Sequence, residues 1–153
     1  MLLQAPSALT ELYEEDYLLW LEKNIKYLRD KNLNLIDYEN LIEELETLGR
    51  SEKRAVESLL KQLLIHLLLY QYWTTEHQRN AHHLAGEIAS FRDQLKRDLK
   101  SKTLYNYALS ELDSLYESSV IIAKAKSNLN FPNQCPYTFA QLLDQNWLPF
   151  ISE

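Results

Sequence analysis

The chain has 153 residues, of which 46% are hydrophobic, 25% are charged and only two are glycine. Average usage of about 7% would give about ten glycines, so this chain has little material for the turns that need a positive φ. It is also rich in leucine and holds only two valines, whereas strands favour β-branched residues. The composition therefore excludes all-β folds, most α/β folds and glycine-rich phosphate-binding loops.

The formal net charge of −6 argues against a sequence-independent nucleic-acid binder, which normally carries a basic surface, so nucleic acid is not an expected partner. A weaker alternative is nucleic-acid association through a small basic patch that consists of Arg92, Lys96, Arg97, Lys100 and Lys102. Cys135 is the single cysteine, so no intrachain disulfide and no cysteine-based zinc site can form. The first residues lack the features of a signal peptide, and no apolar run approaches the roughly 20 residues that span a bilayer. We expect an acidic, soluble protein of the cytoplasm without membrane insertion.

The first expected element is an amphipathic helix over residues 12–28, because Tyr13, Tyr17, Trp20 and Leu21 follow helical spacing. Residues 1–10 before it are expected to form a flexible tail. Residues 30–36 are polar and rich in asparagine, which is typical of a connector.

A second helix is expected after this connector. Asp37 stands where a helix N-cap belongs, and the apolar face expected behind it consists of Leu41, Ile42, Leu45 and Leu48. Gly49 is expected to end this helix in the left-handed region. Ser51 then begins a third helix, whose second half is apolar on nearly all sides and is therefore expected to be central.

A fourth helix is expected after Tyr72 and Trp73, where Thr75 and Gln78 have the spacing of a capping box. It contains Gly86, its inward residues are Leu84, Ile88, Phe91, Leu95 and Leu99, and its outer face is expected to include Arg92.

Ser101 is expected to cap a fifth helix that ends near Asn128. Two prolines make residues 130–137 irregular, and Thr138 is expected to cap a short last helix that runs through Leu143. Residues 1–153 are thus predicted to be one all-α domain, an up-and-down bundle of about five main helices with a short C-terminal helix.

Several of these segments, taken in order, resemble one bacterial family. The segments are Tyr13-Glu-Glu-Asp-Tyr17 with Trp20, the acidic run 37–46, Leu48-Gly-Arg-Ser-Glu52, the run 63–71 around His66, and Cys135-Pro-Tyr-Thr138 with Leu142-Leu143. In order and spacing they are similar to domain-of-unknown-function family 29, from about Leu12 to Pro149. The resemblance implies an all-helical fold and no established activity.

His66 is the best candidate for a catalytic residue, because it lies in the most apolar stretch of the chain. A carboxylate on the preceding antiparallel helix could tune its pKa towards neutrality, and Glu44 is the best guess for that carboxylate. Tyr70 lies one turn further on and completes the candidate set. The alternative is a hydrogen-bonded core histidine that fixes helix register.

Binding candidates fall in two places. Glu39, Glu43 and Glu46 form an acidic stripe on the second helix, which could meet a basic partner or a hard cation, or could be a solvated face paired with nearby arginines and lysines. Tyr72, Trp73 and Arg79 lie near the break between the third and fourth helices. The aromatic residues there could line an interface, or could pack in the core with their polar atoms reaching water.

His83 and Glu87 share a helix face at i and i+4 and are weak candidates for a divalent-metal site, although polar residues at a helix start are commonly just exposed. No cofactor is otherwise expected. The leading functional hypothesis is a helical protein-binding or adaptor module that meets a protein partner or itself. The alternative is a metal-dependent enzyme that uses Glu44 and His66, or His83 and Glu87; no catalytic motif is recognisable.

Overall fold

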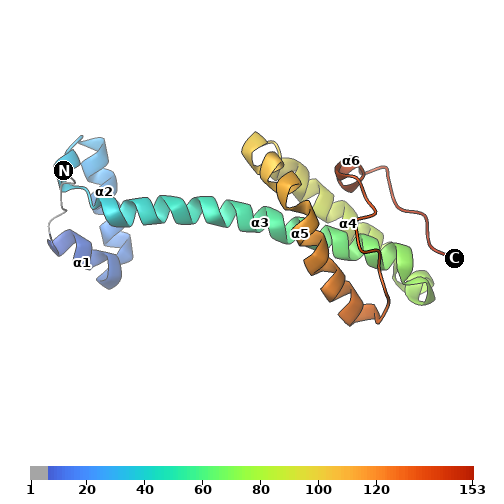
Figure 1. Cartoon of the computed structure of the whole chain (residues 1–153). Helices are drawn as coiled ribbons and strands as arrows, with labels where there is room; N and C mark the ends of the chain where they lie inside the picture. The colour runs from blue at the N-terminus through green and yellow to red at the C-terminus, as the bar shows by residue number, and fades with distance from the viewer. Residues whose placement is uncertain (1–6) are drawn as a thin grey trace. The chain divides into compact units, whose positions relative to one another are not determined.

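The computed structural model describes residues 7–153, and every regular element in that range is helical, as the composition predicts (Figure 1). Contacts divide the chain into two compact units, which we call unit 1 (Met1–Ser51) and unit 2 (Glu52–Glu153). The single domain expected over residues 1–153 stays a prediction. Of the expected N-terminal tail, residues 1–6 lie outside the described range, whereas residues 7–10 belong to a helix.

Unit 1 begins with two helices where one was expected. Helix α1 spans Ser7–Glu15 and helix α2 spans Tyr17–Arg29, so the predicted single helix over residues 12–28 was wrong. Asp16 leaves the helical region with φ −148° and ψ 82°, and its carboxylate accepts from the backbone N–H of Leu19 over 3.1 Å. The break occurs because an aspartate N-cap satisfies one of the free N–H groups of a new helix.

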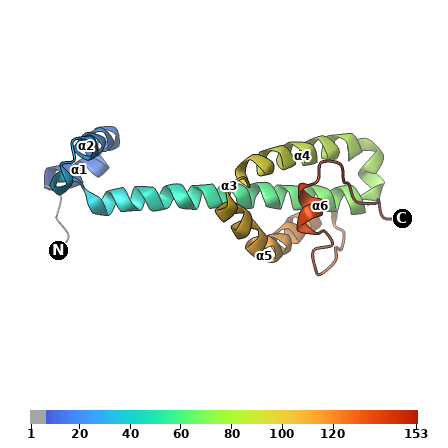
Figure 2. The same cartoon turned by 90° about the horizontal axis from the view of Figure 1, so that it is seen from above.

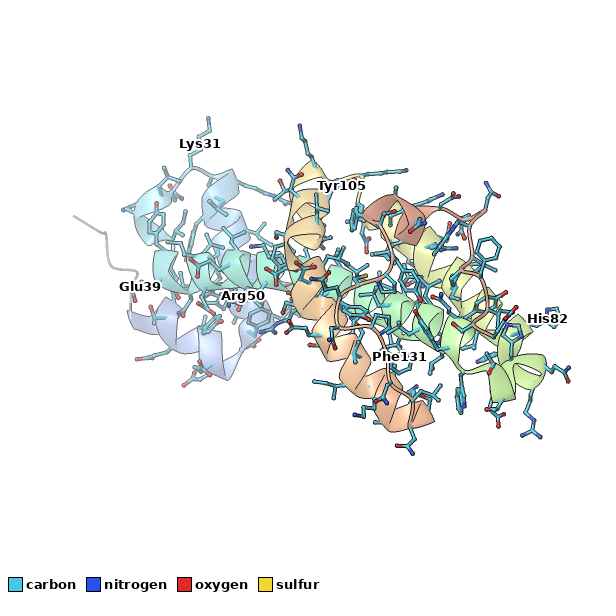
Figure 3. The ribbon with its side chains drawn as sticks, turned by 45° about the vertical axis from the view of Figure 1, so that its right-hand side comes forward. Lys31, Glu39, Arg50, His82, Tyr105 and Phe131 are labelled. Atoms are coloured by element: carbon cyan, nitrogen blue, oxygen red, sulfur yellow. The ribbon has the colours of Figure 1, made fainter. Side chains whose placement is uncertain are left out.

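The connector after α2 turns at Lys31, whose φ of 56° lies in the left-handed region and whose side chain points away from the ribbon in Figure 3. A short 3-10 helix, η1, follows at Leu33–Leu35. Asp37 then caps the next helix as predicted, because its carboxylate oxygens lie 3.5 Å from the backbone nitrogen and 2.7 Å from Nδ2 of Asn40.

Helix α3 runs without interruption over 35 residues, from Tyr38 to Tyr72. The predicted helix end at Gly49 and the new start at Ser51 were therefore wrong. Neither glycine of the chain has a positive φ, so Gly49 adopts the conformation of the helix around it. A glycine in a helix interior costs only about 1 kcal/mol relative to alanine, and that cost does not stop a helix of this length.

Unit 2 is built around the second half of α3. Helices α4 (His77–Asp98) and α5 (Lys102–Ser127) lie on either side of it in Figure 2. The expected central position of this segment is confirmed, because the buried core of α3 consists of Val56, Leu60, Leu63, Leu64, Ile65, Leu67, Leu68 and Leu69. Side chains from α4, α5 and the segment after α5 pack against these residues.

The boundaries of the later helices agree with several local predictions. The Ser101 hydroxyl accepts from the backbone N–H of Leu104, and α5 ends at Asn128, whose φ is 58°. Thr138 and Gln141 form a capping box at α6 (Phe139–Leu143). None of the helices within residues 7–153 combines the length and the apolar character needed to cross a bilayer.

Two predictions about α4 were wrong. The capping box expected at Thr75 does not form; a 3-10 helix, η2 (Thr74–Glu76), leads directly into α4, whose N-cap residue makes no side-chain capping bond. Arg92, expected on the outer face, is only 1% exposed. Arg92 is four residues after Ile88 and Leu95 is seven residues after it, so all three lie on the same face of α4. The guanidinium of Arg92 finds hydrogen-bond acceptors on this buried face.

Arg92 attaches the C-terminal segment to α4. Its Nε, Nη1 and Nη2 donate to the backbone carbonyls of Leu142, Trp147 and Gln141 over 2.8, 2.7 and 3.1 Å. Gln145 adds a bond from its Nε2 to the carbonyl of Ala89 over 2.8 Å. Bonds from Arg92 to main-chain carbonyls therefore help to position the segment after α5, together with the packing of its apolar side chains against the core.

Candidate functional site

The carboxylate of Glu44 is the centre of a polar and aromatic cluster in unit 1. Tyr13 Oη, from α1, donates to its Oε1 over 2.5 Å, and Tyr17 Oη, from α2, donates to its Oε2 over 2.7 Å. The ring of Tyr13 meets that of Trp20 edge to face at 4.9 Å, and Tyr17 stacks on Trp20 at 5.6 Å. One carboxylate thus joins the first three helices of the chain.

These bonds favour the charged carboxylate and the neutral phenols. The hydrogen bond to Glu44 raises the pKa of Tyr13 to about 12 and also raises the pKa of Tyr17. The same two bonds lower the pKa of Glu44. Both carboxylate oxygens already accept from tyrosines, so the arrangement suits an anchor between helices better than a general base.

A buried hydrogen-bond network lies next to this cluster. Trp20 Nε1 donates to Oδ2 of Asp37 over 2.9 Å, and Asn24 Nδ2 donates to the carbonyl of Trp20 over 2.8 Å. Asn24 Oδ1 accepts in turn from the backbone N–H of Asp37 over 3.0 Å. Sequence reasoning missed the role of Asn24, although a polar residue on the apolar side of an amphipathic helix was the available signal.

Glu44 and His66 do not lie on neighbouring antiparallel helices, as the proposed pairing required. Both residues belong to α3, because that helix continues through Gly49. His66 instead places Nδ1 2.8 Å from the carbonyl of Gln62, and its ring meets that of Phe91 at 5.0 Å. The physical basis for a Glu44–His66 pair is therefore gone, while a role for either residue alone stays a prediction.

The surroundings of His66 favour a neutral imidazole. Burial is the main cause that lowers its pKa, assisted by Lys126 and His83, while the Gln62 carbonyl and Glu87 act in the opposite direction. A proton held on Nδ1 by the Gln62 carbonyl leaves Nε2 as the acceptor or ligand atom. The structure thus brings His83 and Glu87 of α4 into the electrostatic environment of His66, which the sequence did not predict.

Tyr70 and His77 form a second contact between α3 and α4. Their ring centroids lie 5.1 Å apart, and His77 Nε2 is buried without a hydrogen-bond partner among the described residues. His82, by contrast, lies near the N-terminal end of α4 and points outward in Figure 3. Within residues 7–153 no three His, Cys, Asp or Glu side chains are arranged to hold a metal ion.

The acidic stripe is exposed and partly paired. Arg50 Nη2 lies 2.8 Å from Oε1 of Glu43, and its Nη1 lies 3.9 Å from Oε2 of Glu46, with all three side chains about half exposed. Glu39 is exposed as well. Exposed ion pairs of this kind contribute little to stability, so the stripe is available for contacts with a partner.

Exposed apolar side chains occur on both α3 and α2. On α3 these are Ile42, Leu45 and Leu48, which are 50, 59 and 63% exposed; we call them the α3 stripe. On α2 the corresponding residues are Leu18, Ile25 and Leu28, which are 63, 39 and 44% exposed; we call them the α2 stripe. The apolar face predicted from Leu41, Ile42, Leu45 and Leu48 lies on a helix as expected, and Ile42, Leu45 and Leu48 of this face are exposed.

The candidates near the break between α3 and α4 have different environments. Tyr72 and Trp73 are partly buried against the core of unit 2, and the ring of Tyr72 meets that of Phe131 at 5.7 Å. Arg79 is exposed, and its Nη1 lies 3.8 Å from Oε2 of Glu76. The two aromatic residues therefore contribute mainly to packing, whereas the guanidinium of Arg79 faces solvent.

A groove of about 530 Å³ lies between α3 and α5 in unit 2. Its lining mixes both signs of charge with three serine hydroxyls and consists of Arg54, Glu57, Ser58, Lys61, Gln62, Glu111, Ser114, Leu115, Ser118 and Ile122. Tyr107 donates a hydrogen bond to Glu57 beside it. Sequence reasoning missed this groove, because its lining comes from helices far apart in the chain.

Comparison with known proteins gives one match. Residues 12–148 match the family described as Domain of unknown function DUF29. No curated protein and no solved structure matches the chain. The family match covers most of the sequence, including the segments that hold the Glu44 cluster and His66, and so the chain belongs to the DUF29 family.

Proposed function

We propose that this protein is a helical protein-binding module that acts as an adaptor through unit 1. The observation that carries the proposal is the exposure of the α3 stripe and the α2 stripe within a unit of about fifty residues. Single exposed apolar residues are ordinary on a protein surface, but clusters of them are typical of interaction sites. Six such residues at helical spacing on two helices support a binding surface.

The acidic stripe supports the same proposal by giving the surface selectivity. Glu39, Glu43 and Glu46 follow the α3 stripe along the helix, and Arg50 is the basic residue among them. An apolar centre with a charged rim is the usual composition of a protein interface. Charges at the rim steer partners and exclude those with the wrong sign. The lone cysteine, which cannot form an intrachain disulfide, supports a cytoplasmic setting for this role.

Site-specific photo-crosslinking tests the proposal. A photoreactive amino acid at Leu45, in the α3 stripe, is expected to capture a protein, either another protein or a second copy, in cells that express the chain. The matched control places the same group at Leu109, which is 48% exposed on α5 in unit 2. Equal capture from both positions, or none from Leu45, would contradict a binding surface on unit 1.

A metal-dependent enzyme is the second candidate, supported by one observation. Glu87 raises and His83 lowers the pKa of His66, so these side chains share one electrostatic environment, although they do not form a three-residue metal site within residues 7–153. A site of this kind would need a further ligand, such as water or substrate. Elemental analysis of untagged protein tests it: a metal near one equivalent that is lost in His66→Leu supports the candidate, and metal far below one equivalent removes it.

A further inference from the structure

We infer that α3 contains a hinge centred on Gly49, where the helix opens and closes locally so that the chain changes direction between unit 1 and unit 2. The inference does not depend on the proposed binding surface, because it concerns the backbone of residues 45–55 and needs no partner. It is carried by three observations on this segment: its exposure on every side, its low helix propensity and the weakness of its side-chain bonds.

No side of α3 is covered by the described chain between Leu45 and Ala55. Every residue of this range is exposed, and the range makes about three turns, so all sides of the helix face solvent. The next residue, Val56, is 1% exposed and begins the core of unit 2. Most helical stability in proteins comes from the packing of an apolar face, so this part of α3 lacks the usual source of stability.

The segment also contains residues with low helix propensity. Thr47, Gly49 and Ser51 stand at every second position, and glycine has the lowest propensity of all residues except proline. A Cβ placed on Gly49 would meet nothing within 4 Å, so no close packing requires a glycine there. The glycine instead leaves the backbone more freedom than any other residue would. The boundary between the two units, after Ser51, falls in the same segment.

Side-chain bonds hold the segment only weakly. Arg50 lies 2.8 Å from Glu43 and 3.9 Å from Glu46, but all three side chains are about half exposed, and exposed pairs contribute little to stability. Lys53 places its Nζ 5.1 Å from the ring centroid of Tyr107 in α5, near the end of the segment. A helix that is exposed all round and has few side-chain pairs is only marginally stable, so opening here costs less than unfolding either unit.

Opening at Gly49 leaves the contacts of both units in place. The hydrogen bonds from Tyr13 and Tyr17 to Glu44 lie before the segment, and the core of unit 2 begins after it at Val56. Neither set of contacts breaks when the backbone between them bends. Hinges of this kind consist of a few residues that absorb a large change in backbone dihedral angles.

Hydrogen exchange of the full chain measures the opening. Amides of residues 49–54 are expected to exchange at least about tenfold faster than those of Ser90 and Asp93, which are also exposed but lie on α4, a helix with a buried face. Gly49→Ala is expected to slow exchange in this segment about two- to fivefold, because alanine favours the helix. Gly86→Ala, the matched control in α4, should leave it unchanged.

Distances between pairs of spin labels show whether the opening bends the helix. In a Cys135→Ser background, labels at Glu39→Cys and Ser58→Cys flank the segment and would lie about 28 Å apart along a straight helix at 1.5 Å per residue. The matched pair, Asn106→Cys and Ala125→Cys, has the same separation within α5, a helix with buried residues along its length. The α3 pair is expected to give the broader distance distribution, extending to shorter distances, and Gly49→Ala is expected to narrow it.

The outcomes that overturn the hinge are specific. Exchange in residues 49–54 as slow as at Ser90 and Asp93, or equally narrow distance distributions for the two label pairs, would overturn it. If Gly49→Ala changed neither the exchange nor the distances, Gly49 would not be the centre of a hinge. None of these results depends on capture at Leu45, so the hinge and the binding surface are tested separately.

Discussion

The hydroxyl of Tyr13 donates a hydrogen bond across 2.5 Å to Oε1 of Glu44, a residue 31 positions later in the chain. Tyr17 completes the same arrangement on the other carboxylate oxygen. The two bonds hold α1, α2 and the start of α3 together in a unit with few buried apolar side chains. The charge state of this cluster therefore affects the stability of unit 1.

The first prediction concerns alkaline titration. The pKa of Tyr13 in the folded chain is about 12, against an ordinary value of 10.0. A raised pKa favours the neutral phenol, so its contribution to stability is complete below pH 10.0 and is lost as the pH rises through about 12. In Glu44→Gln the tyrosinate absorbance should therefore develop at lower pH than in the parent chain. The control makes Glu44→Gln in a chain that already carries Tyr13→Phe and Tyr17→Phe. In that chain the substitution should no longer change the pH at which tyrosinate absorbance develops.

The second prediction distinguishes a continuous α3 from a helix that ends at Gly49. Within a helix, Gly49→Ala should raise the free energy of unfolding by about 0.5–1 kcal/mol. No atom lies within 4 Å of the added Cβ, so no clash opposes the gain. Denaturant unfolding followed by circular dichroism measures the change, and Gly86→Ala in α4 is the matched control with the same expected sign. A loss of stability in Gly49→Ala would instead point to a left-handed residue at the end of a helix.

The third prediction concerns the buried guanidinium of Arg92. Arg92→Met should lower the free energy of unfolding by roughly 2–4 kcal/mol, because three backbone carbonyls lose charged donors in an almost water-free environment. Hydrogen exchange should accelerate selectively in residues 139–147. Arg97→Met, on the same helix, removes only an exposed pair with Asp93 and should change stability by less than about 1 kcal/mol. Equal effects of the two substitutions would refute this role of Arg92.

The fourth prediction concerns acidification. The pKa of His66 in the folded chain lies below its ordinary value of 6.5, mainly because of burial. The unfolded chain then takes up this proton more readily than the folded chain. The free energy of unfolding is therefore unaffected by His66 above pH 6.5, and it declines as the pH falls from 6.5 through the lower pKa that His66 has in the folded chain. Unfolding measured over this range should show the decline, and His66→Leu should remove the part that His66 causes. NMR titration of the His66 ring gives its pKa directly; a value at or above 6.5 would contradict the prediction.

The helical class and most helix ends could be predicted, because they depend on composition and on residues close in sequence. Ser101, Asp37 and Thr138 cap the helices that they were expected to cap. The wrong predictions at Asp16 and Gly49 had the same cause, because whether a helix stops depends on backbone conformation as well as on residue type. Asp16 breaks a helix inside an amphipathic pattern, and Gly49 fails to end one.

The candidate site could be predicted only in part. The pairing of Glu44 with His66 required a helix end at Gly49, and that helix end was predicted wrongly. Two separate helices would have allowed Glu44 to face His66, whereas one continuous helix gives each residue different neighbours. The burial of Arg92 had a visible signal, its helical spacing from Ile88 and Leu95. The spacing was a better guide than the charge, since the acceptors for that charge come from a segment about fifty residues later.

Arg92 recognises the C-terminal segment by its carbonyl groups, and every amino acid supplies the same carbonyl group. Substitutions of Gln141 or Leu142 therefore remove no acceptor of Arg92, and they disturb these bonds only where loss of the Gln141 capping bond or of the buried Leu142 side chain moves the backbone. Insertions or deletions between α6 and Trp147 would instead move the carbonyls out of reach. Among members of the family, this attachment should tolerate changes in sequence far better than changes in loop length.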